Sequence, residues 1–148
     1  MNLKSGIYGK LTVTAIDRKG SRFVYKTPNT LTNEAARVAS HLLVADDIAN
    51  LKITQFKIGT GATAPTRADT DLETPVHQQA ITEFTFPNVG QTEYKIIVDF
   101  LTPANGSMLT EAGLFSADGN SLFARQVHTA IPKDENYKIE YRWRIVFT

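Results

Sequence analysis

The feature that most restricts the fold is the alternation in residues 137–147, YKIEYRWRIVF. Apolar or aromatic side chains occupy every second position, and mostly charged side chains lie between them. Because successive side chains of a β-strand point to opposite faces of a sheet, the pattern predicts a strand with one buried and one solvated face. We expect Trp143 to belong to the core, Phe147 to lie on the same face of the strand, and Arg142 and Arg144 to lie on the opposite face.

Most of the remaining chain also has the period of two that is typical of strands. The predicted strands cover residues 7–16, 22–26, 51–59, 80–86, 92–101 and the two halves of 108–127. Gly20 lies in a tight turn between the first two strands, and Asp118–Gly119 is a hairpin signal between the last two. The strand at 51–59 fits the alternation imperfectly, which indicates a bulge.

One segment, residues 32–46, has helical spacing. Thr32 is a candidate N-cap, and Glu34 follows in the first turn. The expected apolar face consists of Ala35, Val38, Ala39, Leu42 and Leu43. A lone amphipathic helix of this length is not stable in water, so we expect it to pack on a sheet. The predicted fold is a single, mainly β domain over residues 1–148, an antiparallel β-sandwich or curled sheet with one packed helix.

Composition removes several classes of protein. The 148 residues are 42% hydrophobic and 21% charged, with a net charge of +1, so no basic field favours nucleic acid or an anionic membrane as partner. The absence of cysteine excludes disulfides and thiolate chemistry. The N-terminus lacks the apolar core of a signal peptide, and no apolar run approaches the roughly 20 residues of a membrane-spanning helix. We therefore expect a soluble protein made in a cytoplasm.

Residues 59–79 contain an extended irregular segment, and segments of this length are unusual in a compact domain. The stretch IGTGATAPTRADTDLETPV, residues 58–76, has two glycines and three carboxylates. A phosphate-binding loop would need Lys and Ser or Thr after Gly61, where Ala62 and Thr63 follow. An EF-hand loop starting at Asp69 would need other residues at its sixth and twelfth positions. We expect no cofactor and no metal, and interpret Asp69 as an acceptor for backbone N–H groups of a turn.

The sequence also gives little reason to expect an enzyme. The histidines, His41, His77 and His128, lie in no catalytic or zinc-binding motif. Glu83 and Glu111 could pair as in a glycosidase, but we expect Glu111 to bond to nearby backbone or a basic side chain.

A nucleic-acid surface is not expected either. It would have to combine Tyr141 and Trp143 with Arg142 and Arg144, and these two pairs lie on opposite faces of the predicted strand. The arginine face is expected to be a solvated surface or to meet an acidic partner.

Four motifs, in the order TLTNEAARVASHLL, ITQFKIGTGATAPTRADTDLETPV, LTEAGLFSADGNSLFAR and YRWRIVF, cover about residues 28–147. This arrangement resembles a family of small bacteriophage tail-associated structural proteins, linked to the baseplate, tail fibres or collar. The resemblance implies a non-enzymatic virion component, assembled in the host cytoplasm and located in the tail. It also implies a homo-oligomer, a trimer or hexamer, in contact with other tail, baseplate or fibre proteins.

The residues that we expect at interfaces are Gly59, Thr60, Gly61, Pro65, Asp69, Thr70, Leu72, Arg142 and Arg144. Those in the irregular segment also match the family motifs, as do residues 111–115 and Trp143, and all of these are expected to define the fold. We expect the segment to be an arm that lies on a neighbouring copy, so that deletion of residues 62–75 would leave a folded domain of lower oligomeric state. The alternative is a module that binds host carbohydrate through loops near Tyr94, Asn105 and Asn136.

Overall fold

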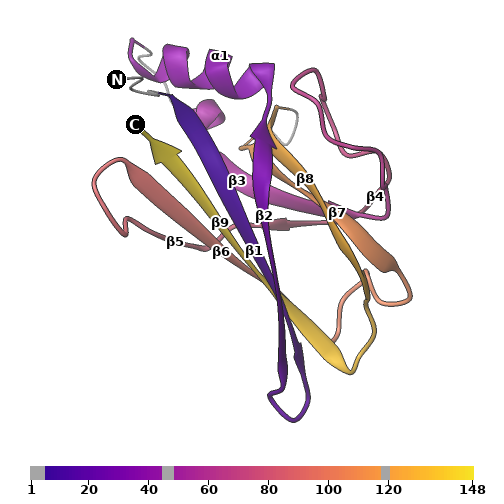
Figure 1. Cartoon of the computed structure of the whole chain (residues 1–148). Helices are drawn as coiled ribbons and strands as arrows, with labels where there is room; N and C mark the ends of the chain where they lie inside the picture. The colour runs from indigo at the N-terminus through magenta and orange to yellow at the C-terminus, as the bar shows by residue number, and fades with distance from the viewer. Residues whose placement is uncertain (1–5, 45–48, 118–120) are drawn as a thin grey trace.

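Hydrogen bonds join nine strands of the described chain in the order β4-β3-β7-β8-β2-β1-β9-β6-β5 (Figure 1). The structure is a computed structural model that describes residues 6–44, 49–117 and 121–148. The strands are β1 (Ile7–Asp17), β2 (Arg22–Leu31), β3 (Ile53–Gly59), β4 (Pro75–Ala80), β5 (Glu83–Thr85), β6 (Gln91–Val98), β7 (Met108–Ser116), β8 (Leu122–Pro132) and β9 (Tyr137–Phe147). All pairings between them are antiparallel.

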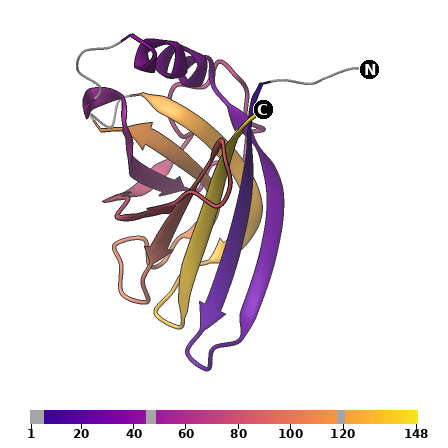
Figure 2. The same ribbon diagram turned by 90° about the vertical axis from the view of Figure 1, so that its left-hand side faces the viewer.

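The strands form two sheets, which confirms the predicted mainly β fold with a sandwich-like arrangement. One sheet contains β1, β2, β5, β6 and β9, and the other contains β3, β4, β7 and β8. The connection between them is short, because β2 pairs with β8 through Thr30 and Leu31 alone. Figure 2 shows the strongly twisted strands of the two sheets, with the helix across one end.

The core lies between the sheets, and β9 supplies its largest side chains. Ile139, Tyr141 and Trp143 are fully buried, whereas Arg142 is exposed on the other face, as the alternation predicts. β9 runs between β1 and β6 and pairs with both. Phe147, expected on the same face as Trp143, is 48% exposed. It pairs with Ile7 at the very end of the sheet, where burial is incomplete.

The predicted helix is present as α1 (Asn33–Leu42). Thr32 is its N-cap, and the Thr32 Oγ1 atom accepts a hydrogen bond from the Ala35 backbone N–H at 3.2 Å. The expected apolar face is correct for Ala35 and Val38 but wrong at its C-terminal end, because Leu42 and Leu43 are 45% and 84% exposed. α1 lies across the end of the sandwich (Figure 1), so its first turns pack on the strands and its last turn does not. Residues 45 and 46 lie outside the described residues.

The remaining predicted elements agree with the structure in part. The region predicted to be irregular, residues 59–79, contains β4, which pairs with β3 through its backbone. The sequence did not indicate this strand because it has no buried apolar face. The bulge expected in the third strand is confirmed by register shifts near both ends of β3. The hairpin of β7 and β8 is confirmed, while its Asp118–Gly119 turn lies outside the described residues. Gly20 has the positive φ expected of a tight turn, 87°.

Candidate functional site

The connection from β3 to β4, residues 60–74, contains neither helix nor strand, and we call it the 60–74 segment. Its two ends meet, because the Thr60 N–H donates to the Thr74 carbonyl at 3.0 Å. Its middle reaches the start of α1, where the Asn33 N–H donates to the Arg67 carbonyl at 2.8 Å. Figure 1 shows the segment as the long magenta loop beside β7 and β8. A segment of this length without regular structure needs other partners for its backbone.

Glu111 of β7 supplies those partners at the base of the segment. Its side chain is fully buried. The Oε1 atom accepts hydrogen bonds from the backbone N–H groups of Gly61 at 3.1 Å and Thr74 at 2.7 Å, and Oε2 accepts one from Glu73 at 3.0 Å. Bonds from N–H groups to a carboxylate are charge-assisted and stronger than those to a neutral acceptor. The prediction that Glu111 bonds to backbone or a basic group is thus confirmed.

Arg125 of β8 balances the charge of Glu111 and is itself only 3% exposed. Its Nε donates to Glu111 Oε2 at 3.0 Å, and its Nη2 lies 2.9 Å from the same oxygen. The Nη1 atom on the far side of the guanidinium is 3.0 Å from Asp69 Oδ2, in the middle of the 60–74 segment. One arginine therefore ties the base and the tip of the segment to the sheet. We call Glu111, Arg125 and Asp69 the buried clamp.

Asp69 also closes a turn within the segment. Its carboxylate accepts hydrogen bonds from both the N–H and the hydroxyl of Thr66, each at 2.9 Å, which confirms its interpretation as a turn acceptor. Burial alone would raise the pKa of Asp69, but the bonds from Thr66 and Arg125 outweigh burial and hold this pKa below its ordinary value. The group therefore stays charged at neutral pH and keeps its bond to Arg125.

An apolar contact holds the second half of the segment. Leu72 is 5% exposed and packs with Phe115 and Leu122. It fits because position 113 has no side chain: a Cβ on Gly113 would lie 2.9 Å from Leu72 Cδ2. Close approach also explains the glycine at position 61, where a Cβ would lie 2.5 Å from the Cβ of Glu73. These glycines allow backbone and side chains to approach one another closely.

The structure brings most of the predicted interface residues of the segment together, but on strands of their own chain. Gly59, Gly61 and Leu72 are buried, and Asp69 belongs to the buried clamp. Thr60 and Pro65 are partly buried, and Thr70 is exposed. The segment thus obtains its order from the same chain, and an interface with another copy stays a prediction for its outer side. That side consists of the exposed residues Ala62, Thr63, Ala64, Thr66, Arg67, Ala68, Thr70, Asp71, Glu73 and Thr74.

The other two predicted interface residues, Arg142 and Arg144, lie far from the buried clamp in the sheet pairing. Both contact Glu93 of β6: Arg142 through Nη1 at 3.1 Å and Arg144 through Nη2 at 2.7 Å. Arg142 also contacts Glu140. Burial acts to raise the pKa of Glu93, but the two arginines outweigh it and hold this pKa below its ordinary value. Each arginine therefore has an acidic partner within the chain, as in a solvated ion-pair network.

The carbohydrate alternative is expected to use loops near Tyr94, Asn105 and Asn136. Tyr94 lies in β6 opposite Trp143, within the predicted strand, and burial raises its pKa to about 12. Asn105 is engaged within the fold: its Oδ1 accepts a bond from Lys133 Nζ at 2.7 Å, and its Nδ2 donates to the Phe100 carbonyl at 2.8 Å. Asn136 is exposed in the turn before β9.

The histidines are also separate from one another along the fold. His41 is exposed on α1, His77 lies on β4, and His128 is buried on β8. Among the described residues, no three His, Asp or Glu side chains are placed to hold a metal ion. Within the same ranges, none of the helices has the length and apolar content needed to cross a membrane.

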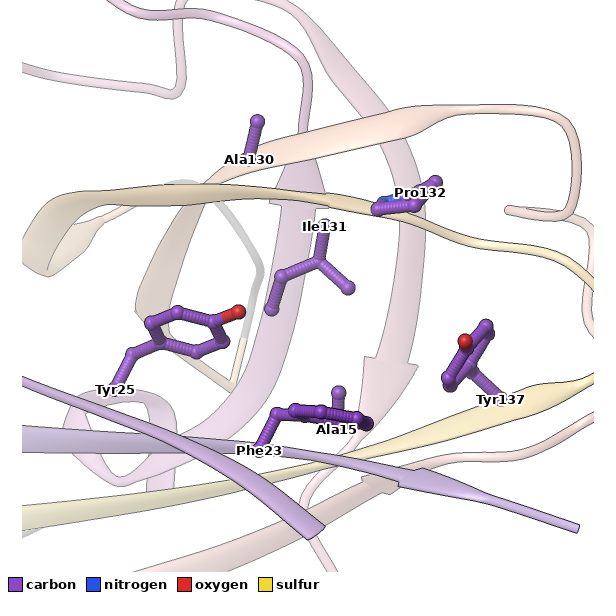
Figure 3. A pocket seen from close by; sticks show the side chains of 7 residues that line it. All are labelled: Ala15, Phe23, Tyr25, Ala130, Ile131, Pro132 and Tyr137. Carbon is purple, nitrogen blue, oxygen red and sulfur yellow. The ribbon is translucent and has the colours of Figure 1, made fainter. Parts of the chain in front are cut away.

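Sequence reasoning missed a pocket of about 200 Å³ between β2 and β8 (Figure 3). It is lined by Ala15, Phe23, Tyr25, Ala130, Ile131, Pro132 and Tyr137. The signal was present as the alternation of RFVYK, in which two aromatic residues share one face of β2. The alternation in β2 is typical of a core strand, however, and does not indicate that β8 lies apart from β2 at this position.

The chain matched no protein-family model, no curated protein and no solved structure.

Proposed function

We propose that this chain is a non-enzymatic structural component of a bacteriophage tail, at the baseplate, a fibre attachment or the collar. It assembles through protein–protein contacts with further copies of itself and with other tail proteins. The order of the four sequence motifs suggests this role. The observation that carries the proposal is that the 60–74 segment, which has little apolar content, is fixed in one conformation by a buried clamp.

A fixed segment is suited to assembly for an energetic reason. Binding by a flexible loop is weakened by the entropy lost when the loop becomes ordered, whereas a preorganised loop avoids most of that cost. The exposed side of the segment is composed mainly of small alanine and threonine residues, with Arg67 as its one exposed cation. Small side chains allow two protein surfaces to approach closely without ordering long side chains.

The arrangement of Glu111 also supports a structural role over catalysis. Its carboxylate receives bonds from Gly61, Glu73, Thr74 and Arg125 and is fully buried. A carboxylate saturated with donors in this way has no free lone pair directed at a substrate. The alternative role, a module binding host carbohydrate, receives less support because Tyr94 and Asn105 are engaged within the fold.

Light scattering on the purified chain over a concentration series tests the proposal. We expect a discrete trimer or hexamer, which Ala64→Arg, a substitution on the exposed side of the segment, shifts towards monomer. Asn88→Arg adds the same charge at an exposed position of the β5–β6 turn and is the matched control. A monomer at every concentration, or equal effects of the two substitutions, would contradict assembly through the 60–74 segment.

A further inference from the structure

β2 and β8 separate soon after the point where they pair. β2 pairs with β8 at Thr30 and Leu31, and β8 contributes Ala124 and Arg125 to this contact. Over the remainder of their lengths, as far as the structure describes the chain, β2 pairs with β1 alone and β8 with β7 alone. Beyond this contact, the two strands leave a gap between them that no described strand fills, and we call this gap the seam. A side-chain bond crosses it near its paired end, where Gln126 Nε2 donates to Thr27 Oγ1 at 3.2 Å. Strand edges that lack a neighbouring strand are templates for an additional strand.

A bulge in β8 follows the point at which the two strands separate. Glu111 of β7 pairs with Val127 and Leu109 pairs with Ile131, so the residues 128–130 of β8 lie opposite Thr110 alone. Extra residues bend a strand and increase its twist, which directs this half of β8 away from β2.

His128 fixes the bulge. Its Nδ1 lies 2.8 Å from the Thr129 carbonyl, which can only accept, so Nδ1 carries the hydrogen. Its Nε2 therefore accepts a hydrogen bond from the Tyr141 hydroxyl, at 3.1 Å. The bulge is thus anchored to the core, and the seam is a built feature of the sandwich.

The floor of the seam is the aromatic pocket. Figure 3 shows the rings of Phe23, Tyr25 and Tyr137 on different sides of Ile131. Phe23 is 50% exposed, although Ala15, its partner on β1, is buried. A volume of about 200 Å³ with aromatic walls suits one large apolar side chain.

The opposite face of β2 carries two cations along the same stretch, Arg22 and Lys26, with the exposed Val24 between them. Arg22 and Lys26 are exposed and alternate with the aromatic residues of the pocket. Neither forms an ion pair with any described residue. A strand added beside β2 would place its side chains alternately next to the pocket and next to these two cations.

We propose that the seam binds an extended strand of a partner protein in which apolar residues alternate with acidic residues. The strand pairs with the free edges of β2 and β8 and places a large apolar side chain among Phe23, Tyr25 and Tyr137. Its acidic residues face Arg22 and Lys26. This mode of recognition combines backbone hydrogen bonds for affinity with alternate side-chain pockets for specificity. The seam is a different surface from the 60–74 segment, so the proposal goes beyond the proposed function and does not depend on it.

A sugar ring could also stack on the aromatic residues, but the free backbone edges and the row of cations favour a peptide. An uncharged sugar would use neither Arg22 nor Lys26, and a compact ring would leave the strand edges unpaired. Glycan binding is therefore a separate outcome of the test.

Calorimetric titration with a nine-residue peptide tests the proposal. The probe alternates glutamate with valine and has tryptophan at the central apolar position; a scrambled peptide of the same composition and a peptide with lysine in place of glutamate are controls. We expect the alternating acidic peptide to bind. Phe23→Ser should weaken binding about tenfold or more, as is typical of a buried aromatic contact. Lys19→Glu, in the exposed turn after β1, should leave it unchanged.

Two further measurements separate the alternatives. The Arg22→Glu and Lys26→Glu double variant should no longer bind the glutamate peptide and should bind the lysine peptide instead. If the apolar pocket alone determined binding, this exchange of preference would not occur. Amide hydrogen exchange should slow along β2 and β8 on binding, because the free edges become paired. Equal binding of the scrambled peptide, no effect of Phe23→Ser, or unchanged exchange would overturn the proposal. So would a glycan screen that gives Phe23-dependent binding while the peptides fail to bind.

Discussion

Glu111 of β7 and Arg125 of β8 form a buried ion pair, with Nε and Nη2 of the arginine 3.0 and 2.9 Å from the same carboxylate oxygen. The two positions are not direct cross-strand partners, since Glu111 pairs with Val127 and Arg125 pairs with Gly113. The glycine leaves room on the sheet face for Leu72. Arg125 and Glu111 therefore act on a segment that crosses over their strands. Their charges stabilise the position of a loop whose one buried apolar contact among the described residues is made by Leu72.

Glu111→Gln should destabilise the fold substantially. The amide removes the charge that neutralises Arg125, and its NH2 group replaces an oxygen that accepts backbone hydrogen bonds. Breaking a buried ion pair in this way costs about 3–5 kcal/mol. Urea unfolding followed by tryptophan fluorescence measures the loss, with Glu135→Gln in the exposed β8–β9 turn as the control. A loss below about 1 kcal/mol, the range of exposed pairs, would contradict the assigned role of Glu111.

Gly113→Ala should displace the 60–74 segment and not the strands. The new Cβ would lie 2.9 Å from Leu72 Cδ2 and the same distance from Phe115 Cε2. Overpacking of this kind costs about 1–3 kcal/mol. Hydrogen exchange should accelerate in residues 60–74, with β9 amides as the internal control.

A double-mutant cycle with Leu72→Ala checks the cause. If the clash with Leu72 is responsible, the two substitutions should destabilise the protein less together than the sum of their separate effects. Strict additivity would show that Gly113→Ala acts through Phe115 or the backbone and not through Leu72.

Much of the fold can be predicted from the sequence because its strands follow a strict two-residue period. β9 is the clearest example, since the burial of Trp143 and the exposure of Arg142 follow directly from alternation. β4 could not be predicted, because the strand has no buried face and is defined by its backbone pairing with β3. The exposed end of α1, at Leu42 and Leu43, depends on where the helix crosses the sheets. No helical periodicity contains that information.

In the candidate sites, too, some features follow from the local sequence and others depend on how the strands pair. Glu111 as a backbone acceptor and Asp69 as a turn acceptor were predictable from residue type and local sequence. Arg125 was not, because its position follows from the pairing of β7 with β8 and from the path of the 60–74 segment over them. The seam was missed for a similar reason. A bulge at residues 128–130 leaves no signal in an alternating pattern that is already irregular there.

Deletion of residues 62–75 distinguishes the arm expected from sequence from the clamped segment of the structure. An arm ordered by a neighbouring copy could be removed without loss of stability. The structure predicts the opposite, because the deletion removes the Glu73 and Thr74 donors of Glu111 and also removes Asp69, the second acidic partner of Arg125. We expect a clearly lower midpoint of thermal unfolding by circular dichroism. An unchanged midpoint together with a smaller oligomer would support the arm.

The buried His128 should make the fold sensitive to mild acid. Burial lowers its pKa below the ordinary 6.5, and this outweighs the effects of the Thr129 carbonyl and Glu111, which act to raise it. The unfolded chain therefore binds a proton at this histidine near pH 6.5, where the folded protein does not. The stability that the neutral, buried His128 contributes is fully present above pH 6.5. It decreases as the pH falls below this value, by up to about 1.4 kcal/mol per pH unit, until the folded pKa is reached.

Urea unfolding at several pH values between 7.5 and 5 measures this slope, and His128→Gln is the informative variant. Glutamine does not titrate and keeps both a donor and an acceptor for Thr129 and Tyr141, so its stability should vary less over this range. His41→Gln, on the exposed face of α1, should retain the slope of the unmodified chain. The carboxylate of Asp69 acts in a lower range of pH. Because the folded protein holds its pKa below the ordinary 3.8, its contribution to stability is present above pH 3.8 and is lost as the pH falls from there through the folded pKa. Identical slopes for the unmodified chain and His128→Gln would show that His128 does not control the acid response.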